Sequence, residues 1–136
     1  MSDVALVYGA RDVEVTRRET LFQGYFRMDA MTLKHRRFDG SWTEGIRREM
    51  FERGDAVAVL PWDVERDQVI LIEQFRPGAI REDESPWMLE AVAGVVELGE
   101  SDDAVAHREA LEEAGCTMDA LLPVVSYYPS PGACSE

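Results

Sequence analysis

The stretch GVVELGESDDAVAHREALEEAGC, residues 94–116, decides the fold of this chain. Its first part is an apolar strand pattern that ends in a glycine-bearing turn, and its second part is a helix pattern. Ser101 can cap the helix, and two aspartates follow it in the first turn, where carboxylates favour the helix dipole. Gly115 is a natural C-terminal stop, so the helix should run to Ala114. This order predicts a contiguous strand, loop and helix.

The predicted helix presents its carboxylates on one face. At about 100° per residue, Glu109, Glu112 and Glu113 fall on one arc, which also contains Val105 and Arg108. The opposite arc contains apolar residues, most of them small: Ala104, Ala106, Ala110, Leu111 and Ala114. We therefore expect the apolar arc to be buried and the acidic arc to be available for chemistry.

Two interpretations of the acidic face are open. Glu109 and Glu113 lie four residues apart, where like charges repel by roughly 0.2–0.5 kcal/mol, and a divalent cation with hard oxygen ligands would relieve that repulsion. Alternatively, the face is only solvated, with Arg108 and Glu112 as an ordinary ion pair. Two glycines in the preceding strand and turn favour the first interpretation, because they suit a backbone that approaches another group closely.

Composition bears on the class of function. The net charge of −13 argues against nucleic-acid binding, which needs a basic surface, but it is compatible with a phosphate substrate bridged by a cation. No apolar run is long enough to span a bilayer, and residues 1–12 lack a secretory pattern. Two cysteines, Cys116 and Cys134, are too few for a disulfide framework. We expect a cytoplasmic protein without nucleic-acid or membrane partners.

Alternating patterns before Gly54 predict a β-rich N-terminal segment over residues 1–52, with a hairpin turn at Phe38–Ser41. Such a segment has too few strands to bury both of its faces alone, so we expect a partner surface in the same chain or in a second subunit. The strands are expected within three stretches: Val13–Thr20, Leu21–Arg37 and Trp42–Glu52.

Residues 53–136 form the second part of the predicted organisation, the catalytic core. The chain stops soon after a Pro/Gly turn without a closing strand or helix, so we expect the natural protein to continue beyond Glu136 and the core to lack its C-terminal part here. Strands in this part are expected within four stretches: Ala56–Pro61, Gln68–Phe75, Trp87–Val96 and Val124–Tyr128.

The spacing of Gly94, Glu100 and Arg108–Cys116 resembles the Nudix box, and every fixed position of that pattern is met. Its aliphatic positions hold Ala110 and Cys116, which remain small and apolar and affect packing more than catalysis. The resemblance implies an α+β protein with the Nudix fold, a mixed β-sheet sandwiched by helices (αβα). The N-terminal antiparallel β unit would then serve dimerisation.

The same resemblance implies roles for individual residues of the box. Glu100 and Arg108 look like the pair that orients the loop and the helix glutamates, so Arg108 is expected to be a positioning residue and not a substrate contact. The implied cofactor is Mg²⁺, with Mn²⁺ as a substitute. Four groups look like metal ligands: the carbonyl of Ala93 and the carboxylates of Glu109, Glu112 and Glu113, of which the three carboxylates complete the implied catalytic set.

Further stretches resemble the ADP-ribose pyrophosphatases of the Nudix superfamily. They are RREMFERG at 47–54, EQFR at 73–76 and PWMLE at 86–90, and Pro131 follows the box where that subgroup has a proline. This implies magnesium-dependent hydrolysis of the pyrophosphate of ADP-ribose to AMP and ribose 5-phosphate. The alternatives are a hydrolase of another nucleoside diphosphate sugar, a non-catalytic Nudix-fold nucleotide-binding module, and an acidic structural domain.

Substrate-binding residues are also implied by this resemblance. Arg76 resembles a phosphate contact, with a surface ion pair as the alternative, and Glu136 resembles a ribose-facing acid beside the turn at Pro131. Tyr25 and Arg48 match positions that reach the substrate from the partner subunit of a swapped homodimer, although Tyr25 also suits ordinary packing. The family places a further glutamate, a general base or metal ligand, on a loop beyond this turn.

Overall fold

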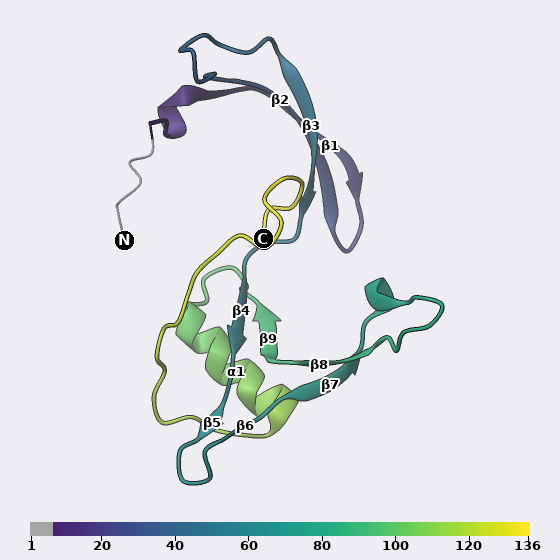
Figure 1. The fold of residues 1–136 in the computed structure, drawn as a ribbon, viewed down its shortest axis with the longest axis vertical. Helices are drawn as coiled ribbons and strands as arrows, with labels where there is room; N and C mark the ends of the chain where they lie inside the picture. Colours follow the sequence, from purple (N-terminus) through teal and green to yellow (C-terminus); the bar gives the residue numbers. More distant parts are fainter. Residues whose placement is uncertain (1–6) are drawn as a thin grey trace. The chain divides into compact units, whose positions relative to one another are not determined.

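The computed structural model describes residues 7–136, which divide into two compact units (Figure 1). The first unit contains the described residues up to Arg53 together with Tyr127–Glu136, and the second contains Gly54–Ser126. Residues 1–6 of the expected N-terminal segment lie outside the described residues. The sequence grouped residues 127–136 with the catalytic core, whereas the structure groups them with the first unit.

The first unit is built on a three-stranded antiparallel sheet with the strand order β1-β2-β3. The register pairs Gln23 with Arg27 across the first hairpin and Arg27 with Glu52 across the next strand. This confirms the antiparallel N-terminal β unit. Its elements are the 3-10 turn η1 (Ala10–Asp12) and the strands β1 (Val13–Gln23), β2 (Arg27–His35) and β3 (Ile46–Glu52).

Two details of the first unit differ from the prediction. Alternating stretches were expected within Leu21–Arg37, including one from Phe22 to Met28, but the chain turns at Gly24–Phe26, where the Gly24 N–H donates to the Phe26 carbonyl at 2.9 Å. The third strand begins at Ile46, because Trp42 forms only an isolated bridge with Arg36. The alternation of apolar and polar residues continues through this turn, so the pattern alone does not reveal it.

The predicted turn at Phe38–Ser41 is confirmed. The Ser41 N–H donates to Asp39 Oδ1 at 2.8 Å, and Gly40 has a φ of +84°, a conformation that glycine adopts without strain. The Ser41 side chain and backbone both lower the pKa of Asp39 by hydrogen bonding. The turn is thus fixed by its own polar residues.

The C-terminal segment joins the first unit through backbone hydrogen bonds to β3. The Phe51 N–H donates to the Ala133 carbonyl at 2.7 Å, and the Ser135 N–H donates to the Phe51 carbonyl at 3.1 Å. The strand expected at Val124–Tyr128 does not form, since this exposed segment has no ladder partner among the described residues. Residues 133–135 therefore belong to the first unit because their backbone pairs with β3, which the local sequence does not indicate.

The second unit contains short antiparallel strand pairs and one α-helix (Figure 1). Strand β4 pairs with β9, β5 with β6, and β7 with β8. None of the described helices is long and apolar enough to cross a membrane. The elements are β4 (Ala56–Val59), β5 (Trp62–Asp63), β6 (Gln68–Val69), β7 (Ile72–Phe75), the 3-10 turn η2 (Pro77–Ala79), β8 (Trp87–Glu90), β9 (Val92–Val95) and α1 (Asp102–Ala114).

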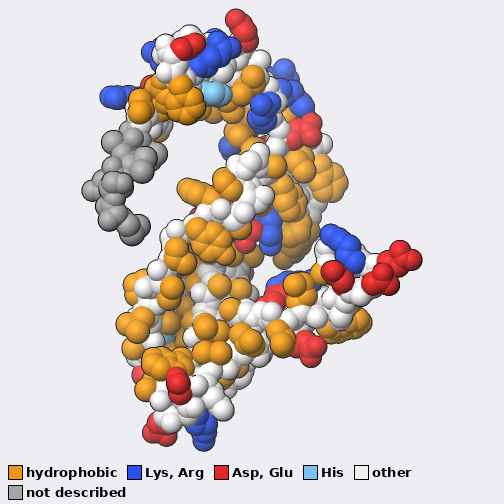
Figure 2. All heavy atoms as spheres, viewed as in Figure 1, with side chains coloured by type: hydrophobic (Ala, Val, Ile, Leu, Met, Phe, Trp, Pro, Cys, Tyr) orange, Lys and Arg blue, Asp and Glu red, His pale blue; other side chains and the backbone are white. Residues whose placement is uncertain are grey.

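The core of the second unit lies where α1 covers β4 and β9. Val92 and Val105 are fully buried there, with Ala106 and Ala110 beside them. The expected apolar arc was therefore placed wrongly, because Val105 had been grouped with the acids and Leu111 is 57 % exposed. Figure 2 shows other hydrophobic side chains on the visible surface of this unit.

Candidate active site

The helix ends are fixed as the sequence predicted. Ser101 Oγ accepts a hydrogen bond from the Ala104 N–H at 3.2 Å, and this caps α1. At the other end, Gly115 has a φ of +63° and its N–H donates to the Leu111 carbonyl at 3.1 Å. These two caps fix where the helix begins and where it ends.

The backbone of β9 lies directly against the glutamate side of α1. A Cβ atom at Gly94 would overlap the carboxyl group of Glu109, so any larger residue at Gly94 must displace that side chain. Glu109 is correspondingly shielded, with its side chain 13 % exposed. The close backbone approach predicted from the glycine spacing is confirmed at this position.

Arg108 connects the loop before α1 to the acids of the helix. Its Nε and Nη2 donate to the two carboxylate oxygens of Glu100, both at 3.1 Å, and its Nη1 donates to Glu109 Oε1 at 2.5 Å. The same Nη1 lies 3.6 Å from Glu112 Oε2. Arg108 thus lies among three carboxylates and balances part of their charge.

These contacts change the acidity of the loop glutamate. Hydrogen bonds from Arg108, and secondly the bond from the Glu97 N–H, lower the pKa of Glu100. The pKa of Arg108 is raised by the same bonds to Glu100 and by its bond to Glu109. Glu100 is therefore a stable carboxylate at neutral pH, which suits a residue that orients an arginine.

The edge of β9 that does not pair with β4 faces side chains of α1. Arg108 Nη2 donates to the Val95 carbonyl at 3.4 Å, and the Ala93 N–H donates to Glu113 Oε2 at 3.3 Å. In an antiparallel ladder, the N–H and C=O of one residue point to the same side of the strand. The Ala93 carbonyl therefore points toward the edge where Glu113 lies.

The predicted metal ligands can be tested against this geometry. Within residues 7–136, no three His, Cys, Asp or Glu side chains converge closely enough to hold a metal ion. Glu109 and Glu112 bind Arg108 instead, and Glu113 binds the Ala93 N–H. The donor chemistry still fits Mg²⁺, which takes carboxylate and carbonyl oxygens.

Glu90 is a site residue that the sequence reasoning did not single out. Its carboxylate accepts from Arg76 Nε at 2.9 Å and 3.0 Å and from Arg76 Nη2 at 2.6 Å, and it also accepts from Gln74 Nε2 at 3.2 Å. The bonds from Arg76 lower the pKa of Glu90 and raise that of Arg76. Only the cross-strand pairing of β7 with β8 places these residues together.

Arg76 therefore forms the ion pair that the sequence allowed as an alternative. The pair uses Nε and Nη2, and Nη1 makes no hydrogen bond to the described residues. The negative charge of Glu113 also contributes to the raised pKa of Arg76, so this guanidinium lies within electrostatic range of the acidic face of α1. An arginine beside the helix acids is available to a phosphate group, as well as to Glu90.

The remaining substrate candidates lie in the first unit. Tyr25, in the β1–β2 turn, is 93 % exposed and contacts Phe26 edge to face at 4.8 Å between ring centroids. Arg48 lies on β3, where its side chain donates to the Arg47 carbonyl at 2.9 Å. The side chain of Glu136 pairs with Arg53 Nη1 at 2.6 Å.

Pro131 lies in a turn of the same unit. The Ala133 and Cys134 N–H groups both donate to the Ser130 carbonyl, at 3.3 Å and 3.0 Å, and close a loop around Pro131. This loop leads directly into the segment that pairs with β3. Pro131 thus shapes the approach of Glu136 and makes no site contact of its own among the described residues.

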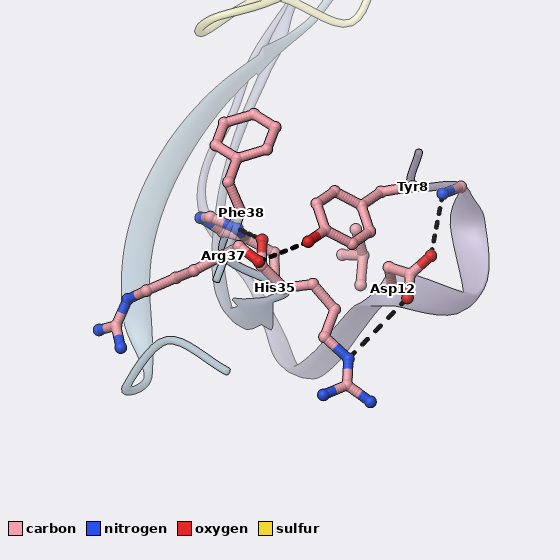
Figure 3. Close-up of a pocket in the computed structure, with 8 residues that line it drawn as sticks. Tyr8, Asp12, His35, Arg37 and Phe38 are labelled. Atoms are coloured by element: carbon pink, nitrogen blue, oxygen red, sulfur yellow. Dashed lines mark hydrogen bonds and ion pairs between the residues drawn. The ribbon is translucent and has the colours of Figure 1, made fainter. Parts of the chain in front are cut away.

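A cavity of about 650 Å³ lies elsewhere in the first unit and is lined by Tyr8, Asp12, His35, Arg37 and Phe38, among others (Figure 3). The Tyr8 hydroxyl donates to the Arg37 carbonyl at 2.6 Å, and Asp12 accepts from the Gly9 N–H at 3.0 Å. Its polar groups are thus bonded to one another. None of the predicted catalytic residues lines this cavity.

Comparison with known proteins shows the family of this chain. The NUDIX domain family matches residues 52–135. The ADP-ribose pyrophosphatase of Escherichia coli (strain K12) is 48 % identical over 134 residues, which cover 98 % of this chain and 64 % of that protein. The ADP-ribose pyrophosphatase of Haemophilus influenzae is 39 % identical over 132 residues, which cover 95 % and 61 %. The chain thus spans less than two thirds of the length of these relatives.

The chain is also similar to a further relative and to a solved structure. A GDP-mannose pyrophosphatase of Yersinia pestis is 32 % identical over 125 residues, covering 91 % of this chain and 62 % of that protein. The crystal structure of an ADP compounds hydrolase superposes with a TM-score of 0.69 at 23 % identity, covering 94 % of this chain and 64 % of that one. This likeness confirms the α+β fold that the sequence predicted.

Proposed function

The chain belongs to the NUDIX domain family, and from this membership we propose that it is a divalent-metal-dependent hydrolase that cuts the pyrophosphate of ADP-ribose into AMP and ribose 5-phosphate. The observation that carries the proposal is the acidic face of α1, with Glu109 held between Arg108 and the backbone at Gly94. Relatives at 48 % and 39 % identity that are named ADP-ribose pyrophosphatases support the choice of substrate.

The metal ligands of the proposed site are the carboxylates of Glu109, Glu112 and Glu113 and the carbonyl of Ala93. A bound Mg²⁺ or Mn²⁺ supplies a Lewis acid that polarises phosphoryl oxygens and makes a bound water more acidic. Glu109 is the best placed of the three acids, because its shielded carboxylate already lies against β9. Glu112 is the most exposed of the acids that contact Arg108 and needs the largest rearrangement to join them.

Glu100 and Arg108 are proposed as positioning residues of this site. Arg108 keeps the helix acids from repelling one another until cations and substrate arrive, and Glu100 fixes the plane of its guanidinium through two hydrogen bonds. Hydrogen bonds of this kind to metal ligands orient those ligands and tune their affinity for the metal. Their loss should weaken catalysis without abolishing the fold.

Arg76 is proposed to contact a substrate phosphate. Its Nη1 and the free N–H of Nη2 remain available while Glu90 holds the other side of the guanidinium. A fixed arginine can bind phosphate through its planar fork with little further loss of side-chain entropy. In a chain with a net charge of −13, such a cation is needed where an anionic substrate must approach carboxylates.

The nucleoside part of the substrate is proposed to contact the first unit. Tyr25 would stack on the base, Glu136 would accept hydrogen bonds from a ribose, and Arg48 and Pro131 would complete this contact surface. We propose that the protein is a cytoplasmic homodimer in which Tyr25 and Arg48 of one subunit reach the substrate bound by the other. No nucleic-acid or membrane partner is part of the proposal.

One alternative has direct support. The relative named GDP-mannose pyrophosphatase, at 32 % identity, makes hydrolysis of another nucleoside diphosphate sugar the second candidate. A non-catalytic nucleotide-binding module is less favoured, because all three helix acids and their positioning arginine are retained.

A product assay tests the proposed reaction. The protein is incubated with ADP-ribose, ADP-glucose, GDP-mannose or NADH, in Mg²⁺ and in excess chelator. We expect AMP from ADP-ribose fastest, and only with the cation. The Glu113→Gln variant should lose this activity, whereas Glu73→Gln, an equal charge change on the exposed side of β7, should not. If ADP-ribose binds but yields no AMP at any protein concentration, the enzymatic proposal fails.

A further inference from the structure

The side chain of Arg76 runs back along the β7–β8 hairpin toward Glu90. In the register, Ile72 pairs with Glu90, so these two side chains share one face. Gln74 and Arg76 follow Ile72 at alternate positions and therefore point to the same face. The backbone of Arg76 is still extended, with φ −119° and ψ 104°, and its N–H donates to the Pro86 carbonyl at 2.8 Å. Arg76 and Glu90 thus start from different levels of the hairpin and meet beside Gln74.

The Glu90 carboxylate orients this guanidinium and balances its charge. Arg76 Nη2 donates to Oε2 at 2.6 Å and Nε donates to Oε1 at 2.9 Å, so that two N–H groups meet two oxygens. Gln74 Nε2 also donates to Oε2, at 3.2 Å, and holds the carboxylate from the side. The Glu90 side chain is 22 % exposed, which partly shields the pair from water. The direction of the Arg76 side chain therefore depends on Glu90.

Glu113 is the helix acid whose charge no arginine balances among residues 7–136. The other two acids proposed as metal ligands contact Arg108, whereas Glu113 accepts a hydrogen bond from the Ala93 N–H at 3.3 Å. Ala93 lies only three residues after Glu90, so the chain itself brings Glu113 near the Arg76–Glu90 pair. The negative charge of Glu113 also contributes to the raised pKa of Arg76. If Glu90 were lost, Glu113 would be the carboxylate that attracts Arg76.

We propose that Glu90 is a positioning residue that keeps Arg76 from pairing with Glu113, and so leaves the Glu113 carboxylate available to a divalent cation. The proposal rests on the metal site of the proposed hydrolase and adds to it a residue that touches neither the cation nor the substrate. An arginine paired with Glu113 would compete for the carboxylate oxygens that Mg²⁺ takes as ligands. The unbalanced charge of that arginine would also repel the cation.

This arrangement reconciles two opposite requirements for Arg76. A positive side chain beside the acids favours the approach of a substrate phosphate, but the same charge lowers the affinity of those acids for a metal ion. Glu90 binds Nε and Nη2 of Arg76 and leaves Nη1 for the phosphate. Loss of Glu90 should therefore weaken metal binding only in a protein that still contains Arg76.

The test is a double-mutant cycle on Arg76 and Glu90 in the absence of substrate, with Mn²⁺ as the probe and free Mn²⁺ measured by electron paramagnetic resonance. We expect Glu90→Gln to raise the Kd for Mn²⁺ about tenfold, as the loss of groups that support metal ligands does. The double variant Arg76→Met/Glu90→Gln should bind Mn²⁺ within about twofold of the unmodified protein, because the competing arginine is gone. Arg76→Met alone should not weaken binding.

Two further variants serve as references for this cycle. Glu73→Gln makes the same charge change on the opposite face of β7 and should leave the Kd for Mn²⁺ unchanged. Glu113→Gln removes the proposed ligand itself, and its Kd should be at least as high as that of Glu90→Gln. If Glu90→Gln does not fold, as judged by its melting temperature, Glu90→Met replaces it in the cycle with the same expected results.

Two results would overturn the proposal: a Kd for Glu90→Gln equal to that of the unmodified protein, or a double variant that binds Mn²⁺ as weakly as Glu90→Gln. The second result would show that Glu90 acts on the metal site directly or through the fold. Neither result touches the proposed hydrolysis if the unmodified protein produces AMP. An unmodified protein that binds Mn²⁺ but produces no AMP refutes the hydrolysis, while the cycle still decides the role of Glu90. An unmodified protein that binds no Mn²⁺ refutes both.

Discussion

The two units of this chain assemble their candidate residues in different ways. In the second unit, Gly94, Glu100, Arg108 and the helix acids come from one contiguous stretch, and strand β9, a short loop and helix α1 bring them together. In the first unit, Tyr25 comes from a hairpin turn and Glu136 from a segment more than a hundred residues later in the numbering.

This difference separates what each unit contributes. In the second unit, the proposed catalytic acids lie on one short stretch of chain, between the two helix caps and against the backbone at Gly94. In the first unit, backbone pairing with β3 and the Arg53–Glu136 ion pair bring together residues that are distant in the sequence, and these residues are the proposed substrate contacts. Changes in the second unit should therefore reduce kcat, and changes in the first should raise KM.

The largest effect is expected from Glu109→Gln. This change removes the charge of the most shielded helix acid while preserving its shape, and kcat should fall about a hundredfold or more because a metal ligand is lost. Steady-state kinetics with ADP-ribose measures it, with Glu73→Gln as the control. A large rise in KM at unchanged kcat would show that Glu109 binds substrate and does not act in the chemical step. The two units would then no longer differ in their expected effects on kcat and KM.

Gly94→Ala should have the next largest effect. The added Cβ would overlap the Glu109 carboxyl group, so the side chain must leave its position against β9. We expect kcat to fall about 10- to 100-fold, as for other changes that misplace a metal ligand. Gly78→Ala, where a Cβ meets no atom within 4 Å, is the control. Activity equal to that of the unmodified protein would show that the close approach has no catalytic role.

Tyr25→Ala tests the first unit. Loss of the exposed ring should raise KM about tenfold through lost base stacking, with little change in kcat. Tyr25→Phe, which retains the ring and lacks only the hydroxyl, should behave like the unmodified protein. If Tyr25→Ala reduces kcat and leaves KM unchanged, the first unit is not only a binding surface.

The smallest effect concerns stability in acid. Arg76 lowers the pKa of Glu90 below its ordinary value of 4.5, so the pair stabilises the fold above that pH and this stabilisation is lost as pH falls through the lowered pKa. Because Arg76 is about half exposed, we expect at most about 1 kcal/mol. Urea unfolding between pH 3 and pH 7 should therefore show a flatter pH dependence for Glu90→Gln than for the unmodified protein.

Sequence reasoning was most successful where structure is local. The N-cap at Ser101, the stop at Gly115 and the turn at Asp39 and Gly40 each depend on neighbouring residues, and all three are confirmed. The phase of the buried helix face was wrong, because the strands that cover α1 decide whether Val105 or Leu111 is buried. Helical periodicity shows which residues of α1 share a face, but not which face packs against the strands.

Non-local contacts escaped prediction for the same reason. The Arg76–Glu90 pair requires the register of β7 and β8, and the Arg53–Glu136 pair requires the pairing of a late segment with β3. Neither register leaves a signal in a single sequence. The turn at Gly24–Phe26 was hidden because the apolar alternation continues through it.

The proposed hydrolysis depends above all on divalent-metal binding by the acids of α1. The most direct measurement is the melting temperature in increasing Mg²⁺ for the unmodified protein and for Glu113→Gln, because a ligand that binds only the folded state stabilises it by about 2.7 kcal/mol at a hundred times its Kd. We expect the melting temperature of the unmodified protein to rise and then saturate with Mg²⁺, and that of Glu113→Gln to rise much less. Equal shifts in the two proteins, or no shift in either, would contradict this expectation.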